Sequence, residues 1–502
     1  MKRTISLVLF GMMAVIASGC SVGPNYHRPA IDSPATWQNP DTTFYADSTY
    51  YADSTAVAAE IEWWRLFGDT VLTDLISIGV EENLDVRVAA ARVEELMGRY
   101  GVTKSDYFPK IGATGTGARG QFGSPGQVPE TKRPTVEYWE VNVSADWEID
   151  LWGKIRRANE AAKAGLLASE EARRGVVLST ISLVANSYID LLALDRQLEI
   201  AQETAATRKE ALDLFGQRRE KGDLSDLEYA QAESEYWLAM SQIPVIEKNI
   251  VFVENNLNYL LGRNPGPIPR GSRLEGLALP EVPVGMPSGL LERRPDVRFA
   301  EEQLRAANAQ IGVAKSYYFP SISLSGLFGV ASGDLSKLFE SNSQVWDVGG
   351  GVFQPIFRWG EIRGGVKAAE GVQKQALYSY VQAVRNAFRE TENALTDRTR
   401  TGELLDAEGN RVTALSTYAR LANMRYDEGV TSYLEVLDAE RALFSTQLDY
   451  TKTQAELYKT VVAIYQALAG SWLDQAAVES FRVEEDVEPR NIEYPEQPET
   501  DR

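Results

Sequence analysis

The feature that most constrains the fold is an internal duplication of the 502-residue chain. Residues 85–111, DVRVAAARVEELMGRYGVTKSDYFPKI, return at 296–322 as DVRFAEEQLRAANAQIGVAKSYYFPSI. The block WGKIR after Leu151 returns as WGEIR after Arg358, and a third block around Gly222 returns around Gly429. Three blocks in the same order and at nearly constant spacing predict a tandem repeat of about 210 residues. The first repeat is placed at residues 69–270 and the second at 280–472.

Each repeat is expected to contain a helix that ends at a Phe-Pro pair, two strands and a long helical hairpin. Proline ends helices and restricts the residue before it, so Pro109 and Pro320 mark the change from helix to strand. Residues 137–149 alternate apolar and polar side chains, which is typical of a strand with one apolar face. The expected first helices are residues 70–105 and 288–316, and the expected strands are residues 111–122, 137–149, 321–330 and 344–357.

The longest predicted elements are helices over residues 154–220 and 361–428. A heptad-like row of apolar residues follows the first of them, with a polar interruption at Arg208. At 1.5 Å per residue, about 65 residues make a helix of ~100 Å, longer than a compact domain of this size. Gly222 and Gly429 are expected to end these helices. Return helices are expected to follow, capped by Ser225 and Ser432 and ending near Leu261 and Leu468.

Composition excludes several classes of function. The chain has 51 Lys and Arg against 71 Asp and Glu, a net charge of −20, whereas nucleic acid and anionic lipid bind basic surfaces. One Cys cannot form an internal disulfide, and one His leaves little for a zinc or copper site. We therefore expect no catalytic residues, no metal and no cofactor. A GxGxxG sequence at 115–120 is followed by prolines rather than a helix, which argues against a dinucleotide site.

The N-terminus is typical of a secreted protein. Lys2 and Arg3 precede an apolar run at 5–16 that is too short for a stable transmembrane helix, and Ala-Ser-Gly-Cys follows. This ending resembles a bacterial lipobox, so residues 1–19 are interpreted as a signal peptide and Cys20 as the lipidated, palmitate-bearing residue. The alternative is an ordinary signal peptide that is cut near a cysteine. After the signal peptide we expect a lipid-anchored extended segment at 20–68. At the other end of the chain we expect an acidic, disordered tail at 473–502.

The four predicted strands also bear on the oligomeric state. The rest of the chain shows no second long apolar run, so a membrane would have to be crossed by strands. A membrane barrel must be closed and needs at least about eight strands, more than one chain supplies. Three copies would supply twelve strands, and their helices would then form a hollow helical barrel.

Four short motifs stand out along the chain: Gly23-Pro24-Asn25-Tyr26-His27-Arg28-Pro29, Trp63-Trp64 with Phe67, Leu291-Glu292-Arg293-Arg294-Pro295-Asp296 and Tyr318-Phe319-Pro320-Ser321-Ile322. Together they resemble the TolC-like outer-membrane factors, in particular their lipoprotein branch. The resemblance implies an α+β membrane protein, a homotrimer with a twelve-stranded barrel in the outer membrane and a long α-helical barrel in the periplasm. It also implies a periplasmic adaptor protein and an inner-membrane resistance-nodulation-division pump as partners. The function implied is multidrug efflux, the passive passage of drugs or other small toxic compounds to the exterior.

The resemblance also assigns residues to a periplasmic tip and its gate. Leu434, Asp438 and Arg441 share one helical face, and three copies of Asp438 around an axis would repel one another and attract cations. The implied gate residues are Leu434, Glu435, Asp438 and Arg441. The implied adaptor-docking residues are Gly222, Asp223, Leu224 and Ser225 in the first repeat and Gly429, Val430, Thr431 and Ser432 in the second. Without the resemblance, Glu435 and Asp438 would be interpreted as solvated surface carboxylates.

Two other functions remain open from the sequence. The first is the outer-membrane duct of a type I secretion system for proteins or peptides, which the lipobox and the Arg-Pro-Asp motif disfavour. The second is a structural coiled-coil lipoprotein that conducts nothing. The duplicated amphipathic strands argue against the second function, because a stalk has no need of them.

Overall fold

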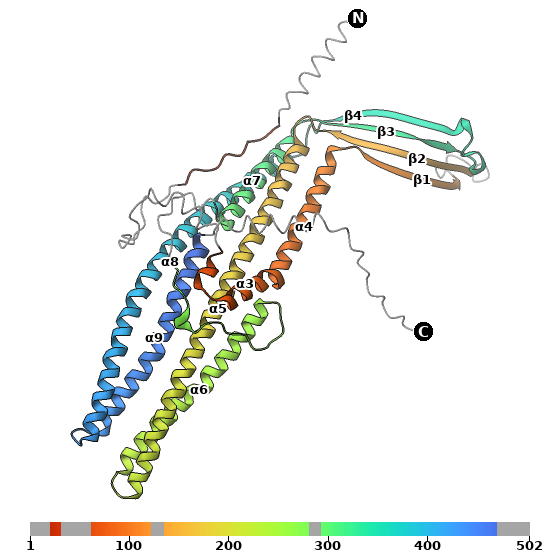
Figure 1. The fold of residues 1–502 in the computed structure, drawn as a ribbon. Coiled ribbons are helices and arrows are strands. Elements are labelled where there is room, and N and C mark those ends of the chain that lie inside the picture. Colours follow the sequence, from red (N-terminus) through yellow and green to blue (C-terminus); the bar gives the residue numbers. More distant parts are fainter. Residues whose placement is uncertain (1–20, 32–61, 122–134, 281–292, 469–502) are drawn as a thin grey trace, which may run out of the picture. The chain divides into compact units, whose positions relative to one another are not determined.

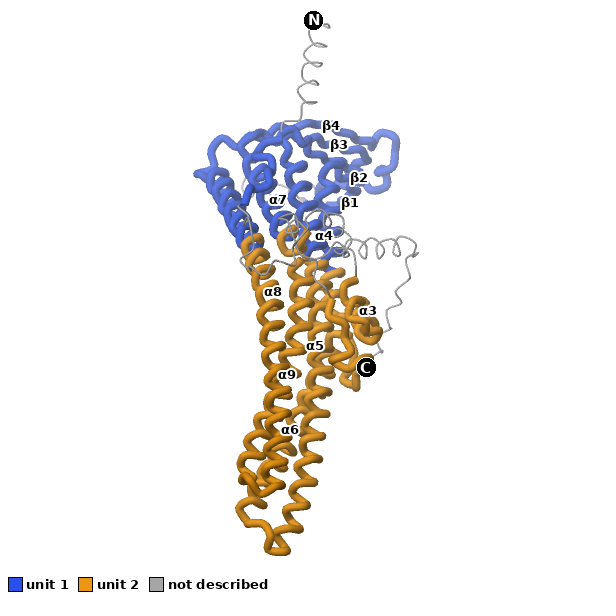
Figure 2. Tube along the Cα trace, turned by 60° about the vertical axis from the view of Figure 1, so that its left-hand side comes forward, with its two compact units in different colours: residues 1–31, 91–171, 299–383 blue, residues 32–90, 172–298, 384–502 orange. Residues whose placement is uncertain are grey.

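The computed structural model of the protein describes residues 21–31, 62–121, 135–280 and 293–468. The predictions for the signal peptide, for Cys20 and for the acidic tail lie outside the described residues. The chain divides into two compact units (Figure 2). The sheet unit takes residues 1–31, 91–171 and 299–383, and the hairpin unit takes residues 32–90, 172–298 and 384–502. Both repeats contribute to both units, so neither repeat folds as a separate domain.

The sheet unit contains one antiparallel sheet with the strand order β1-β2-β3-β4 (Figure 1). Its strands are β1 (Lys110–Gln121), β2 (Thr135–Ile149), β3 (Ser321–Ser332) and β4 (Gln344–Phe353). All four predicted strands are therefore confirmed, but the prediction that the last one reaches residue 357 is wrong. β2 of the first repeat pairs with β3 of the second, which leaves β1 and β4 at the edges.

Cross-strand register gives the sheet one apolar and one polar face, as the alternation predicts. Val143 lies between Ala113 on β1 and Phe328 on β3, and Phe328 in turn lies opposite Trp346 on β4. The opposite face carries polar residues of β2, since neighbouring side chains along a strand point to opposite sides. These are Glu140, Asn142, Ser144, Asp146 and Glu148.

The predicted long helices and their return helices are confirmed. The four helices are α5 (Lys154–Glu220), α6 (Asp226–Leu260), α8 (Glu361–Asp427) and α9 (Tyr433–Leu468). The helix before β3 is α7 (Pro295–Ser316), so it begins later than the predicted residue 288, since Arg293 and Arg294 are not helical. The short 3-10 helices are η2 (Trp63–Phe67), η3 (Ser105–Tyr107), η5 (Leu274–Gly276), η7 (Leu335–Lys337) and η8 (Ser341–Ser343).

The first helix of the first repeat differs from the prediction, because it is two helices, α3 (Thr70–Glu82) and α4 (Leu84–Lys104). Asn83 between them has an extended backbone. Its Oδ1 accepts the backbone N–H groups of Asp85 at 2.9 Å and Val86 at 3.1 Å, and its Nδ2 donates to the carbonyl of Leu260 at 2.8 Å. The amide side chain thus takes over bonds that a continuous helix would make through its backbone, and it caps α4.

The hairpin unit is held by an apolar core around η2. Trp63 is fully buried and stacks on Tyr465 of α9 with ring centroids 5.4 Å apart. Tyr188 of α5 is also fully buried, and it donates to Asp69 at 3.1 Å while its hydroxyl accepts the backbone N–H of Gly271 at 2.9 Å. A second core, near the turns of the hairpins, places Phe215 of α5 against Tyr433 of α9, with ring centroids 4.6 Å apart. The two repeats therefore share both cores.

Candidate functional site

The apolar face of the sheet is exposed in the single chain. Its exposed side chains come from all four strands, and soluble monomers rarely expose a continuous apolar surface of this kind. They include Ile111, Val141, Val143, Phe328, Trp346 and Val348. Among the described residues, β1 and β4 are the outer strands of the sheet, and each has one edge without a neighbouring strand. An apolar face together with open edges predicts contact with lipid on the face and with further strands at the edges.

The segment that follows Cys20 packs within the sheet unit. Tyr26 donates to Glu301 of α7 at 3.1 Å, and the Arg28 Nε donates to the same carboxylate at 3.1 Å. Gly23 has φ of 104°, and a Cβ at this position would lie 2.5 Å from the Cα of Gly312. Only glycine adopts this backbone conformation readily and lets the segment lie this close to the backbone of α7. The Gly-Pro-Asn-Tyr-His-Arg-Pro motif is thus explained by docking onto α7.

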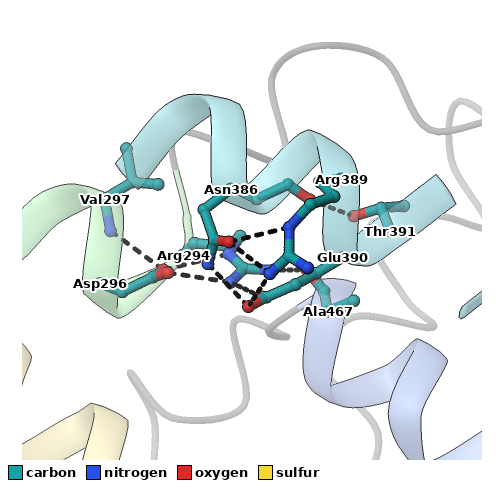
Figure 3. Close-up of polar contacts among 9 residues, drawn as sticks. Arg294, Asp296, Val297, Asn386, Arg389, Glu390, Thr391 and Ala467 are labelled. Carbon is teal, nitrogen blue, oxygen red and sulfur yellow. Dashed lines mark hydrogen bonds and ion pairs between the residues drawn. The ribbon is translucent and has the colours of Figure 1, made fainter. Parts of the chain in front are cut away.

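The Arg-Pro-Asp motif at the start of α7 ties three helices of the hairpin unit together (Figure 3). Arg294 is buried, and its Nε and Nη2 donate to the two carboxylate oxygens of Asp296 at 3.0 and 2.9 Å. Nη2 also donates to Glu390 of α8 at 2.5 Å, and Nη1 donates to the carbonyl of Ala467 in α9 at 3.0 Å. Burial works against the charge of Arg294, but these two carboxylates raise its pKa above the usual value. The motif is therefore a structural clamp.

The two hairpin turns have the same backbone geometry. Gly222 and Gly429 are left-handed, with φ of 81° and 72°. In the first turn the N–H of Gly222 bonds to the carbonyl of Arg219 and that of Asp223 to the carbonyl of Arg218. The second turn repeats this pattern from Gly429 and Val430. Both are Schellman motifs, which confirms the predicted role of the two glycines as helix stops.

Side chains distinguish the two turns. The Ser225 hydroxyl oxygen accepts from the backbone N–H of Glu228, and the Glu228 carboxylate accepts from the backbone N–H of Ser225, which is a complete capping box. In the second turn Glu435 accepts from Arg425 at 3.0 Å and from the Thr431 hydroxyl. Glu435 is thus engaged within its own turn.

Leu434 and Asp438 lie on an exposed face of α9. Leu434 is 61% exposed, and Asp438 is exposed one helical turn further on. Asp438 interacts with the hydroxyl of Tyr418 on α8. Desolvation and the charges of Asp438 and Glu435 raise the pKa of that hydroxyl. The predicted gate residues therefore divide into an exposed pair, Leu434 and Asp438, and a turn residue, Glu435.

Arg441 takes part in a charge cluster that joins the two hairpins. It donates to Glu235 of α6, whose Oε2 lies 3.1 Å from the Nη1 of Arg208 on α5. The side chains of Arg208 and Glu235 are each 4% exposed, whereas that of Arg441 is 61% exposed. Sequence reasoning named Arg208 only as a polar interruption and missed Glu235. The signal was a charged residue in an apolar row, which needs a partner of opposite charge.

The described residues contain no group of three or more His, Cys, Asp and Glu side chains that could hold a metal ion. Helix α5 contains an 18-residue window that is apolar enough to span a membrane, so the expectation of no second long apolar run is wrong. However, 72% of that window is buried within the structure, as in the core helix of a soluble domain.

Comparison with known proteins gives consistent similarities over almost the whole chain. A family model described as outer membrane efflux protein matches residues 75–263 and 286–470. The chain is 34% identical over 473 residues to the toluene efflux pump outer membrane protein TtgI of Pseudomonas putida, covering 93% of this chain and 98% of that protein. It is 31% identical over 463 residues to the cation efflux system protein CusC of Escherichia coli, covering 92% and 97%. The crystal structure of the open state of the Neisseria gonorrhoeae MtrE outer membrane channel is similar with a TM-score of 0.79 and 29% identity, covering 90% of this chain and 99% of that chain.

Proposed function

Because this chain belongs to the outer membrane efflux protein family, we propose that it forms the outer-membrane channel of a tripartite efflux system and passively conducts small toxic compounds to the exterior. The observation that carries the proposal is the four-stranded sheet with an exposed apolar face and two open edges. A sheet of this kind suits a lipid environment and cannot close on itself. The two long helical hairpins of the same chain suit the wall of a periplasmic duct.

The proposed assembly is a homotrimer. Three four-stranded sheets make a twelve-stranded barrel, which exceeds the minimum of about eight strands for a membrane barrel. The apolar face would then contact lipid, and the face with Glu140, Asn142 and Asp146 would line the aqueous interior. This orientation explains why apolar side chains such as Trp346 and Val348 are exposed in the single chain.

The N-terminal segment supports a lipid anchor at Cys20. Ser21, the next residue, is held in the sheet unit, where the N–H of Val22 donates to the carbonyl of Trp152 at 3.0 Å. A Cβ on Gly153 would lie 2.8 Å from the Cβ of Ser21. An acyl chain on Cys20 would therefore start close to residues that follow directly on β2.

The partners we propose are a periplasmic adaptor protein and an inner-membrane pump of the resistance-nodulation-division class. The adaptor would dock on the two hairpin turns, residues 222–225 and 429–432. The matched Schellman geometry of the turns supports this role, because it presents two similar, rigid tips on each chain. With three chains an adaptor would meet six such tips.

The proposed gate is formed by three copies of Leu434 and Asp438, with Arg441 as the residue that ties α9 to α6 through Glu235. Glu435 would act on the gate through the second turn, where it binds Arg425. Carboxylates that repel one another around a symmetry axis would narrow the passage and attract cations. The relatives are named for efflux of toluene and of cations, so we assign the choice of substrate to the pump.

The test is conductance of the purified full-length protein in planar lipid bilayers, combined with export from a deletion strain. The proposal expects discrete cation-selective channels and accumulation of toxic compounds in the deletion strain, which the gene on a plasmid reverses. A trimer that conducts no ions would support a structural lipoprotein instead. Loss of a secreted protein, with unchanged sensitivity to toxic compounds, would support a type I secretion duct.

A further inference from the structure

The duplication is preserved in the sheet down to single hydrogen bonds. Lys110 lies opposite Asp146 where β1 pairs with β2, and the corresponding residues Ser321 and Phe353 lie opposite each other where β3 pairs with β4. The side chain of Trp147 donates to the carbonyl of Tyr107 at 3.0 Å. The corresponding Gln354 donates to the carbonyl of the corresponding Tyr318 at 3.2 Å. Contacts of the first repeat therefore predict contacts at equivalent positions of the second.

One contact at the junction of the repeats has no equivalent within a single chain. Trp152, just after β2, stacks on Phe319, just before β3, with ring centroids 4.8 Å apart and ring planes at 25°. Its indole N–H donates to the carbonyl of Pro320 at 2.8 Å. This aromatic staple fastens the end of β2 to the start of β3, the two strands that join the repeats.

The residues that correspond to this staple lie at the two open edges of the sheet. Trp359, the equivalent of Trp152, follows β4 and is 89% exposed. Phe108, the equivalent of Phe319, precedes β1 and is 64% exposed. Trp359 also has φ of 46°, a left-handed conformation that a bulky residue rarely adopts. A large exposed aromatic ring on an unusual backbone conformation indicates a contact that the single chain does not make.

We propose that Trp359 of one copy stacks on Phe108 of a second copy and donates its indole N–H to the carbonyl of Pro109 in that copy. The staple fastens β4 of the first copy to β1 of the second, so it repeats at every subunit boundary of the trimer. This inference rests on the trimer of the proposed function and adds to it a specific joint and register.

The same correspondence sets the register of the strands at the boundary. Ile149 lies opposite Ile322 and Ala145 opposite Gly326 where β2 pairs with β3. Carried over to the boundary, Ile356 lies opposite Ile111 of the second copy, and Val352 lies opposite Gly115. All four positions are on the apolar side, whereas a shift by one residue would place Ile356 against the polar side.

The end of β4 supports this register. Ile149 is the last residue of β2, but its equivalent Ile356 lies beyond Phe353, where β4 ends. Ile356 and Ile111 are 96% and 75% exposed. A partner strand along the open edge would let β4 continue from Phe353 to Ile356.

Disulfide cross-linking tests the register in the full-length protein in outer membranes. Ile111→Cys with Ile356→Cys is expected to give dimers and trimers on denaturing gels after oxidation, and reductant should abolish them. The matched control, Gly112→Cys with Ile356→Cys, places the two sulfurs on opposite faces and should stay monomeric. An intrachain bond is excluded, since β1 and β4 are separated by two strands, about 14 Å at ~4.8 Å per strand, whereas bridged Cα atoms lie within about 7 Å.

Aromatic substitutions test the staple itself. Trp359→Ala and Phe108→Ala are each expected to raise the fraction of monomer released on heating the detergent-solubilised trimer by about threefold to tenfold. The double variant should release no more monomer than the more affected of the two single variants, because both remove the same contact. Phe339→Ala, which removes another aromatic ring of the sheet unit that is 80% exposed, should release no more monomer than the unchanged protein. Trp359→Phe should restore much of the stability because it keeps the stacked ring.

The outcomes separate this inference from the proposed function. A trimer that conducts ions but cross-links through Gly112→Cys, or not at all, overturns the register. A conducting trimer whose stability is unaffected by Trp359→Ala overturns the staple. Failure to form any trimer or channel would instead refute the proposed function, and the staple with it.

Discussion

Glu235 is the residue whose removal should most weaken the hairpin tips. Its carboxylate lies between Arg208 and Arg441, and Arg208 is buried as deeply as Glu235 itself. Burial lowers the pKa of Arg208 in spite of the neighbouring Glu235, which shows that desolvation disfavours this buried cation and that the carboxylate offsets part of the cost. Glu235→Ala leaves a buried cation without its counter-charge, which typically costs about 3–5 kcal/mol. Arg208 keeps its bond to the Glu235 carbonyl at 2.7 Å, which favours the lower end, about 3 kcal/mol.

Two variants distinguish this reasoning from a general effect of substitution. Arg441→Ala removes the exposed partner of the same carboxylate, and an exposed ion pair contributes only about 0.2–1 kcal/mol. The double variant Arg208→Met with Glu235→Leu replaces the buried pair by apolar side chains, which is often neutral or stabilising. We therefore expect a large loss for Glu235→Ala, a small loss for Arg441→Ala and near recovery for the double variant.

Hydrogen exchange followed by mass spectrometry measures these local stabilities in the intact protein. With about 1.4 kcal/mol for each tenfold change, Glu235→Ala should speed exchange in peptides of α6 and α9 near the turns by roughly a hundredfold. Arg441→Ala should speed it less than about fivefold, and peptides around Tyr188 should be unchanged in both variants. Equal effects of Glu235→Ala and Arg441→Ala would refute the argument from burial.

Three further predictions concern the gate, the turns and the helix clamp. Asp438→Ala should raise single-channel conductance and lower cation selectivity in bilayers. The control Asp449→Ala, which removes an exposed aspartate of the same helix, should leave both quantities unchanged. Unchanged conductance and selectivity for Asp438→Ala would remove Asp438 from the gate. Gly429→Ala should speed hydrogen exchange at the second turn by about fivefold, because a left-handed alanine costs roughly 1 kcal/mol, while Gly216→Ala inside α5 should slow exchange there. Arg294→Met should lower the free energy of unfolding by about 1–3 kcal/mol, a moderate value because its carboxylate partners are half exposed, and a thermal midpoint equal to that of the unchanged protein would contradict the clamp.

Much of this architecture follows from patterns that are local in the sequence. The apolar side of β2 was predictable because side chains alternate along any strand, and the helix stops at Gly222 and Gly429 were predictable because glycine adopts the left-handed conformation easily. The break at Asn83 was not predicted, although Asn is a good cap. The apolar residues before and after Asn83 favour one continuous helix. The break at Asn83 is decided by the carbonyl of Leu260, to which the Asn83 side chain donates only in the folded chain.

The sequence by itself therefore determined the repeat, most of the helices and strands, the faces of the strands and the positions of the turns, since these depend on residues a few positions apart. Tertiary structure decided which side chains meet across the repeats. Arg441 and Glu235 are 206 positions apart on different hairpins, and Arg294 before α7 is 173 positions from Ala467 of α9, so both pairings depend on how helices distant in the sequence pack. It also showed that Trp152 and Trp359, which stand in the same local sequence, differ in their surroundings. One is stacked at an inner seam of the sheet and the other is exposed at its edge, because an open sheet has an outer strand on each side.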